Sequence, residues 1–271
     1  MIILQELTES YSLVLLSLGA GFLTFLLTGL GSSGTLFLNK VNPKVFSLSL
    51  GFSGGIMIAA SFWSLLNPAL ELAERHHSFA FFPVTVGFIL GIILLRLMDL
   101  FIPHLHLTSL PEEQEGLKIP LRKGVLILLA ITIHNIPEGL ALGVSFGSVE
   151  ENKELIISAF NLTLALGIQN IPEGLALSLA LRHTGFSKVE SFLYGALSAF
   201  VEPLFSLLGA VATLWIKLAL PYALSLAAGA MIFVTIEELL PEAQKYGTSD
   251  LASIGFGLGF LTMMILDTSL S

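Results

Sequence analysis

The sequence reads HNIPEGLAL at residues 134–142 and QNIPEGLAL at residues 169–177, so eight residues, NIPEGLAL, recur at an offset of 35. Each copy lies near the middle of a long apolar stretch and carries a proline followed by a glutamate. A proline inside a helix leaves the carbonyl four residues earlier without its usual hydrogen bond. Freed carbonyls and carboxylates at membrane depth are tolerated where they line a polar cavity or contact an ion. The repeat therefore predicts a polar site inside a helical membrane protein.

The composition of the 271 residues supports this interpretation. Hydrophobic residues make up 54% of the chain, charged residues only 12%, and the mean hydropathy is +0.88. A soluble protein carries about twice that share of charged residues. The net charge of −8 argues against nucleic-acid binding, and the absence of cysteine excludes thiolate metal sites. Because the sequence contains no GxxxxGK[ST] loop, we expect no ATP hydrolysis.

Eight apolar stretches are long enough for transmembrane helices, which need about 20 residues each. We predict one all-α polytopic membrane domain over residues 1–271. The expected helices cover residues 12–38, 45–70, 79–103, 122–147, 154–181, 189–216, 219–241 and 251–268. Alternate loops carry eight Lys and Arg on one side of the membrane and three on the other. The positive-inside rule then places the N- and C-termini outside.

A fainter repeat relates the second and seventh stretches. Gly55-Ile-Met-Ile and Leu65-Leu-Asn-Pro-Ala resemble Gly229-Ala-Met-Ile and Leu239-Leu-Pro-Glu-Ala. These two spans run in opposite directions, which predicts an inverted 3+2+3 arrangement with helices 4 and 5 central, a common design of transporters. Close helix packing, inside the chain or across a homodimer seam, is predicted at Gly87, Gly91, Gly255, Gly257 and Gly259.

The two motif copies place metal ligands on neighbouring antiparallel helices. His134 and Glu138 are four residues apart and share a helix face, as do Gln169 and Glu173. Glu202 adds a third acid near the same depth in the sixth span. Three ionised carboxylates in hydrocarbon are costly without cations, and spans four to six offer no basic partner at that depth. One divalent cation, or two that share Glu138 and Glu173, would neutralise this charge. Imidazole, carboxylate and amide ligands suit Zn²⁺, Fe²⁺, Mn²⁺ or Cd²⁺.

The segments HNIPEG at 134–139 and QNIPEG at 169–174, together with Glu202-Pro203, resemble the ZIP (zinc/iron-permease) family of metal transporters, closest to its GufA-type branch. The resemblance implies uptake of metal ions into the cytosol through a binuclear site between spans four and five, bridged by Glu138 and Glu173. The residues that match the family's ligand positions are His134, Asn135, Glu138, Gln169, Asn170, Glu173 and Glu202. Many relatives place His or Asp where this chain has Gln169 and Asn170, so its ligand shell carries less charge.

The ends of the spans hold further candidates. The resemblance suggests a cytosolic exit site formed by Asp99, His104, Glu237 and Glu238, although a simple ion pair between Arg96 and Asp99 competes with that role. We expect residues 104–121 to form a flexible, solvated loop, with a weak metal-collecting role of its histidines and acids as the alternative. Outside, the candidates for an entrance are Glu71, His76 and His77, which otherwise form an ordinary polar helix end.

These features predict a secondary transporter that moves divalent metal ions, zinc foremost, across the plasma membrane or a bacterial inner membrane. Alternating access would move the unit of spans four and five against a scaffold. The expected partners are the metal ions and the lipid bilayer, with a homodimer as an option and no catalytic cofactor. The alternatives are an intramembrane metalloenzyme, which the absence of HExxH disfavours, and a metal sensor.

Overall fold

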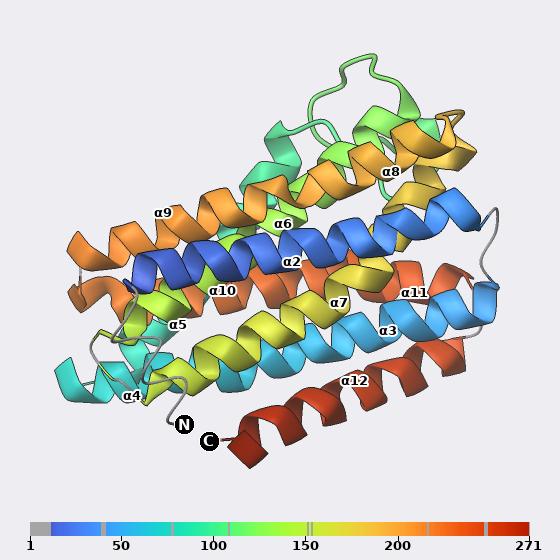
Figure 1. Cartoon of the computed structure of the whole chain (residues 1–271). Helices are drawn as coiled ribbons and strands as arrows, with labels where there is room; N and C mark the ends of the chain where they lie inside the picture. Colours follow the sequence, from blue (N-terminus) through green and yellow to red (C-terminus); the bar gives the residue numbers. More distant parts are fainter. Residues whose placement is uncertain are drawn as a thin grey trace.

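The computed structural model describes residues 12–38, 42–76, 79–107, 109–150, 152, 154–215, 217–246 and 249–270. Within these residues the secondary structure is helical, apart from one isolated β-bridge (Figure 1). Eight helical segments are long and apolar enough to cross a membrane, which confirms the polytopic all-α prediction. No predicted end of a span differs from the observed one by more than six residues. We therefore describe the chain as an integral membrane protein.

Three of the eight spans contain a change of helix type. The spans are α2 (Leu13–Phe37); α3 (Pro43–Ala60), η1 (Ser61–Leu66) and α4 (Asn67–His76); α5 (Phe81–Phe101); α6 (Lys123–Ser148); α7 (Leu155–His183); α8 (Lys188–Leu197), η3 (Ser198–Phe200) and α9 (Val201–Trp215); α10 (Leu220–Val234), η5 (Thr235–Leu239) and α11 (Leu240–Tyr246); and α12 (Ser249–Leu270). Short 3₁₀ turns, η2 (Pro111–Glu113) and η4 (Lys217–Ala219), lie in connections.

Local sequence signals explain where several helices begin. The Ser12 hydroxyl accepts the N–H of Leu15 at the start of α2, and the Asn42 side chain caps α3, whose first residue is a proline. Ser187 and Glu190 form a reciprocal capping box at the start of α8. These caps satisfy backbone donors that helix geometry leaves free.

The second and seventh spans share the same irregularity. Each contains a π-helical turn, η1 or η5, that begins six residues after Gly55 or Gly229. In both spans a proline, Pro68 or Pro241, stands two residues after the turn. Because a proline has no N–H to donate and its ring crowds the preceding turn, it disturbs the regular helix there. The faint repeat in the sequence therefore coincides with a repeated local structure.

The packing of the spans also follows the inverted arrangement. Helix α2 packs against α7 and α6 against α9, while α3 packs against α12 and α5 against α10. In chain order, the α2–α7 pair joins spans 1 and 5, and the α6–α9 pair joins spans 4 and 6. Exchanging spans 1, 2 and 3 with spans 6, 7 and 8, and span 4 with span 5, converts the first pair into the second. The same exchange converts the α3–α12 pair into the α5–α10 pair. The helix pairing thus supports the predicted 3+2+3 order, with the two motif helices α6 and α7 in contact at the centre (Figure 1).

Close glycine contacts divide the spans into two groups. In the central group (α2, α6, α7, α8 and α9), Gly31 meets the backbone of Ile171, and Gly174 meets that of Thr28. In the flanking group (α3, α4, α5, α10, α11 and α12), equally close backbone approaches join α3 to α12 and α5 to α10. The glycines that make them are Gly51, Gly55, Gly87, Gly91, Gly229, Gly255 and Gly259. A side chain at these positions would force the helices apart, so each helix pair is tightly joined. Within the flanking group the two pairs meet where α10 packs against η1 and α4, and α11 packs against α3.

Four of the five glycines that we considered for helix packing thus lie at internal contacts. Gly87 and Gly91 approach α10, and Gly255 and Gly259 approach α3, so these four are not a homodimer seam. A Cβ added to Gly257 would have no atom within 4 Å.

The first part of the connection between α5 and α6 is packed, contrary to the expectation of a solvated loop, whereas residues 117–121 are exposed as expected. Leu105 is fully buried against Leu126 and Ile127. The backbones of His104 and Glu115 pair in the β-bridge, with N···O distances of 3.3 and 3.0 Å. The sequence HLHL at 104–107 alternates polar and apolar residues, and its leucines fasten this connection to the bundle. We call the end of the bundle that holds this connection the loop end, and the opposite end the far end.

Candidate metal sites

A buried cluster of acids and amides lies where α6, α7 and α9 meet. Glu138, Gln169 and Glu202 are completely buried. The Gln169 side-chain nitrogen donates to Glu138 Oε1 at 2.8 Å and to Glu173 Oε2 at 3.2 Å. It also lies 2.7 Å from Asn170 Oδ1. The two acids of the repeated motif therefore converge on one amide group, as expected from the antiparallel motif helices.

The third acid belongs to the same cluster. Asn170 Nδ2 donates to Glu202 Oε1 at 2.9 Å and to Oε2 at 3.1 Å. The motif's glycines make this approach possible, because a Cβ on Gly139 would lie 2.6 Å from the carbonyl oxygen of Glu202. The glycine after Glu138 thus lets α9 bring its carboxylate next to α6 and α7.

The cluster has unused ligand capacity. Glu138 Oε2 and Gln169 Oε1, both possible metal ligands, are buried and have no hydrogen-bond partner. Among the described residues, no Lys or Arg forms an ion pair with Glu138, Glu173 or Glu202. Buried polar atoms are rarely left unpaired, and buried carboxylates need a compensating charge. A divalent cation held by carboxylate and amide oxygens would supply both.

His134 lies at the edge of this group of acids, on the narrow cavity that Glu173 also lines. Its Nε2 contacts Glu238 Oε1 of η5, and both side chains are buried. His134 therefore joins the motif of α6 to the seventh span. Its place in the ligand set with Glu138 stays a prediction.

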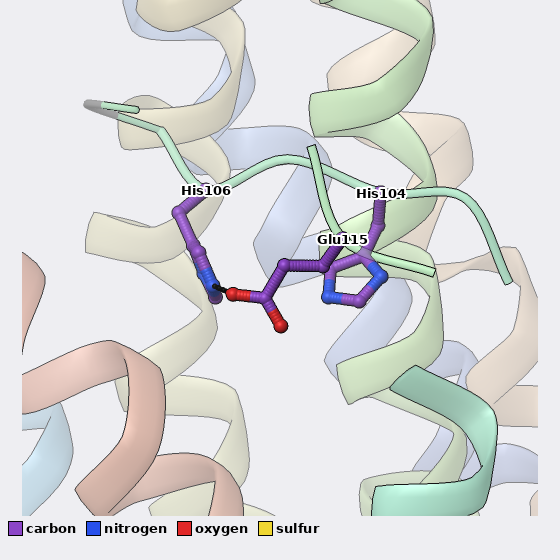
Figure 2. Close-up of side chains that lie close together, drawn as sticks. All are labelled: His104, His106 and Glu115. Atoms are coloured by element: carbon purple, nitrogen blue, oxygen red, sulfur yellow. Dashed lines mark hydrogen bonds and ion pairs between the residues drawn. The ribbon is translucent and has the colours of Figure 1, made fainter. Parts of the chain in front are cut away.

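A second cluster of possible ligands lies at the loop end. His106 Nδ1 is 3.0 Å from Glu238 Oε2, and His106 Nε2 is 3.2 Å from Glu115 Oε1. Figure 2 shows His106 joined to Glu115, with His104 beside them on the same connection. His104 Nε2 lies 3.9 Å from Asp99 Oδ1.

Two sets of three residues in this cluster could each hold a metal ion. In each set, one ligand atom per residue lies within 4.8 Å of the others. The sets are His104, His106 and Glu115, and Asp99, His104 and Glu238. Imidazole nitrogen and carboxylate oxygen are common ligands of zinc and related metals.

Comparisons with known proteins agree with this chemistry. A family model described as ZIP Zinc transporter matches residues 108–267. Zinc transporter ZIP11 of Homo sapiens is 38% identical over an alignment of 339 positions, which covers 97% of this chain and 99% of the relative. Zinc transporter GufA of Myxococcus xanthus is 35% identical over 93% of this chain and all of the relative, and zinc transporter ZIPB of Bordetella bronchiseptica is 37% identical over 91% and 78%. The chain belongs to the ZIP zinc transporter family. This is a family of transporters rather than enzymes.

Two neighbouring cavities lie between the central cluster and the loop-end surface of this ZIP family member. A cavity of about 280 Å³ opens at the loop end and is lined by His106, Glu238 and Glu242, among others. The same three residues line a narrower cavity of about 20 Å³ that reaches His134 and Glu173. The two cavities thus share His106, Glu238 and Glu242 between the loop-end surface and the central cluster, and the acids and histidines of the narrower cavity lie among mostly apolar side chains.

The electrostatics of the loop end centre on His106. Its hydrogen bond to Glu238, helped by Glu115, raises the pKa of His106 to about 9 despite partial burial. His106 is therefore protonated at pH 7 in the metal-free protein. A metal ion that binds the ring nitrogens must displace this proton.

The exit residues that we predicted separate into two kinds. Asp99, His104 and Glu238 come together, whereas Glu237 points outward and lies 3.6 Å from Arg96. Arg96 thus contacts the seventh span instead of pairing with Asp99, and the competing interpretation of Asp99 as its partner is not what the structure shows.

Two ligands at the loop end were not among the exit residues. His106 and Glu115 were noted only as possible collectors of metal in a loop. The signal that could have found them is the spacing of His104 and His106, which places both imidazoles on one side of an extended segment. Of the expected entrance residues, Glu71 is exposed on α4, His76 is the last residue of that helix, and His77 lies outside the described residues.

Proposed function

We propose that this protein carries Zn²⁺, and with it Fe²⁺, Mn²⁺ or Cd²⁺, across the membrane into the cytosol. The observation that carries the proposal is the buried group of Glu138, Glu173 and Glu202, which has amide partners but no Lys or Arg partner among the described residues, and whose Glu173 lines a cavity on the loop-end side. The names of the relatives support zinc as the principal ion. The distribution of Lys and Arg supports a cytosolic loop end and external termini, in a plasma or bacterial inner membrane.

The ligand groups support two ion positions. One lies at Glu138, Gln169 and Glu173, and the other at Asn170 and Glu202, while Asn135 lies one turn before Glu138 on α6. Rotation of the Gln169 and Asn170 amides would turn their oxygens toward the ions in place of their N–H groups. Glu138 and Glu173 then bridge the two ions, and His134 completes the first position or receives the ion next.

In this proposal the ion is released along the narrow cavity toward the loop end. An ion that leaves Glu173 meets His134, then Glu238, and then His106 with Glu115. Each step exchanges carboxylate and imidazole ligands of similar chemistry, so no step strands the ion without ligands. With an inside-negative potential of 100 mV, inward movement of a divalent ion gains about 4.6 kcal/mol.

We propose alternating access between the central and flanking groups. Their close backbone contacts lie within each group, whereas side-chain contacts such as Ser53 Oγ to the Gln169 carbonyl and His134 to Glu238 cross the boundary. Side-chain contacts are exchanged more readily than interlocked backbones. The cavity at the loop end fits an inward-facing conformation.

Uptake of radioactive zinc into proteoliposomes tests the proposal. The isosteric variant Glu138→Gln keeps the acceptor for Gln169 but removes the charge, and we expect it to abolish uptake while leaving the purified protein monodisperse. Unlabelled Fe²⁺, Mn²⁺ and Cd²⁺ rank the substrates by competition. Unchanged uptake by both Glu138→Gln and Glu173→Gln would contradict the site. No uptake by the folded wild type, under any gradient of charge or pH, would contradict transport.

A further inference from the structure

A buried carboxylate lies near the far end of the bundle, away from both metal clusters. Asp267, in the last turn of α12, is 6% exposed. Its Oδ1 accepts a hydrogen bond of 3.0 Å from Asn161 Nδ2 of α7. Ser64 Oγ of η1 lies 3.3 and 3.1 Å from the two carboxylate oxygens. Asn161 Nδ2 is also 3.4 Å from the carbonyl oxygen of Leu266.

These contacts join the two helix groups. Asn161 belongs to the central group, whereas Asp267 and Ser64 belong to the flanking group. Asn161, Ala165 and Gln169 are spaced by four residues and lie on one face of α7, between the far end and the central cluster. Ala165 is fully buried, so this face is covered, whereas the cavities that reach the central cluster open at the loop end.

We propose that Asn161, Asp267 and Ser64 form a latch that holds the far end closed in this conformation and is released when the site opens outward. The proposal rests on the alternating access proposed above. Burying a carboxylate among apolar helices is costly, and neutral side chains would join the helices at least as well. A carboxylate has good partners in both states, amide and hydroxyl donors when closed and water when open. It therefore keeps the two states close in free energy, as a switch requires.

If the latch exists, substitutions of Asn161 and of Asp267 should shift the population of the open far end in opposite directions. Asn161→Ala removes a donor that Asp267 has only in the closed state, so it shifts the population toward the open far end. Asp267→Asn keeps the size and can still be hydrogen-bonded, but a neutral amide costs less to bury than a carboxylate. It shifts the population toward the closed far end. A merely structural contact would be weakened by both changes in the same direction.

The chain has no cysteine, so single cysteines can report on both ends. Ala165→Cys reports on the face of α7 between the latch and the central cluster, and Ala130→Cys reports on the narrow cavity on the loop-end side that Ala130 lines. The full-length variants in lipid nanodiscs are treated with a water-soluble thiol reagent. We expect Asn161→Ala to raise the labelling rate at position 165 about fivefold, the population change for loss of one ordinary hydrogen bond, and Asp267→Asn to lower it.

Thr163→Ala is the matched control. Thr163 is buried on the same helix, two residues from Asn161. Its hydroxyl donates a hydrogen bond to the Ala159 carbonyl of its own helix. Removing this hydroxyl should therefore leave both labelling rates unchanged. An unchanged rate at position 165 in Asn161→Ala, or equal effects of Asn161→Ala and Asp267→Asn, would overturn the latch. If the rate at position 165 rises while that at position 130 stays constant, the latch stands and strict alternation fails. Opposite shifts in a chain that transports no zinc would leave the latch and remove the proposed function.

Discussion

His134 of α6 and Glu238 of η5 are in direct contact through Nε2 and Oε1, although they lie in different helix groups. The pair stands where the cavity from the loop end reaches the central cluster. Glu238 also binds His106 through its other oxygen, so one carboxylate contacts the motif helix and the loop-end cluster at the same time. On the proposed release path, an ion that moves between the clusters meets this carboxylate.

Glu238→Ala should therefore impair transport far more than Glu237→Ala. Glu238 is buried and paired with two histidines, whereas its neighbour is half-exposed and contacts only Arg96 among the ion pairs found. Truncating one member of a buried charge pair costs about 2–5 kcal/mol, so we expect zinc uptake at limiting concentration to fall at least about tenfold. Glu237→Ala should stay within about twofold, as is common for exposed ion pairs. Equal losses in the two variants would argue against an exit path through Glu238.

The raised pKa of His106 predicts a pH-dependent stability of the metal-free protein. Because the pKa is about 9 in the folded chain and about 6.5 when unfolded, folding favours the protonated ring. This contribution is fully present below about pH 6.5 and is lost as the pH rises through 9. The apparent melting temperature in chelator should thus fall between pH 7 and pH 9.5. His106→Gln should show a smaller fall over the same range, and parallel curves for the two proteins would contradict the assignment.

The spans and the central cluster were predictable from sequence because both follow from local patterns. Apolar runs fix the spans, and the repeated motif fixes the turn on which each acid lies. Gly139 shows why the motif also sets the packing, since only a glycine allows Glu202 so close to Glu138. The direction of His134 was not predictable, because its partner is 104 residues away on another span.

The loop end was predictable only in part, for a different physical reason. Glu237 and Glu238 are adjacent and identical in type, and the π-helical turn decides which of them faces inward. His106 and Glu115 meet because the connection folds back on itself in a β-bridge. Neither the π turn nor the bridge has a periodic signal in the sequence, so hydropathy alone suggested a solvated loop.

The two ion positions predict a change in stoichiometry. Glu202→Gln removes the only carboxylate that Asn170 contacts in the structure, whereas Glu138 and Glu173 stay in place around Gln169. We expect the wild type to bind two zinc ions per chain at the central site and the variant one fewer, with weakened but measurable transport. Elemental analysis after gel filtration gives the count, in the background of His104→Ala and His106→Ala, since His104 belongs to both loop-end sets. An equal count in both proteins would show that Glu202 holds no second ion.

Glycine substitutions separate the central helix contacts from the outer surface of α12. Gly139→Ala places a Cβ 2.6 Å from the Glu202 carbonyl oxygen, so α9 must move away from α6. Overpacking of this kind costs about 1–3 kcal/mol. We expect a lower melting temperature and, because Glu202 moves with α9, weaker zinc binding than in the wild type. Gly257→Ala is the matched control, since its Cβ meets no atom within 4 Å and alanine is the better helix former. A melting temperature and zinc affinity of Gly139→Ala equal to those of Gly257→Ala would mean that α9 does not depend on this contact to bring Glu202 to the site.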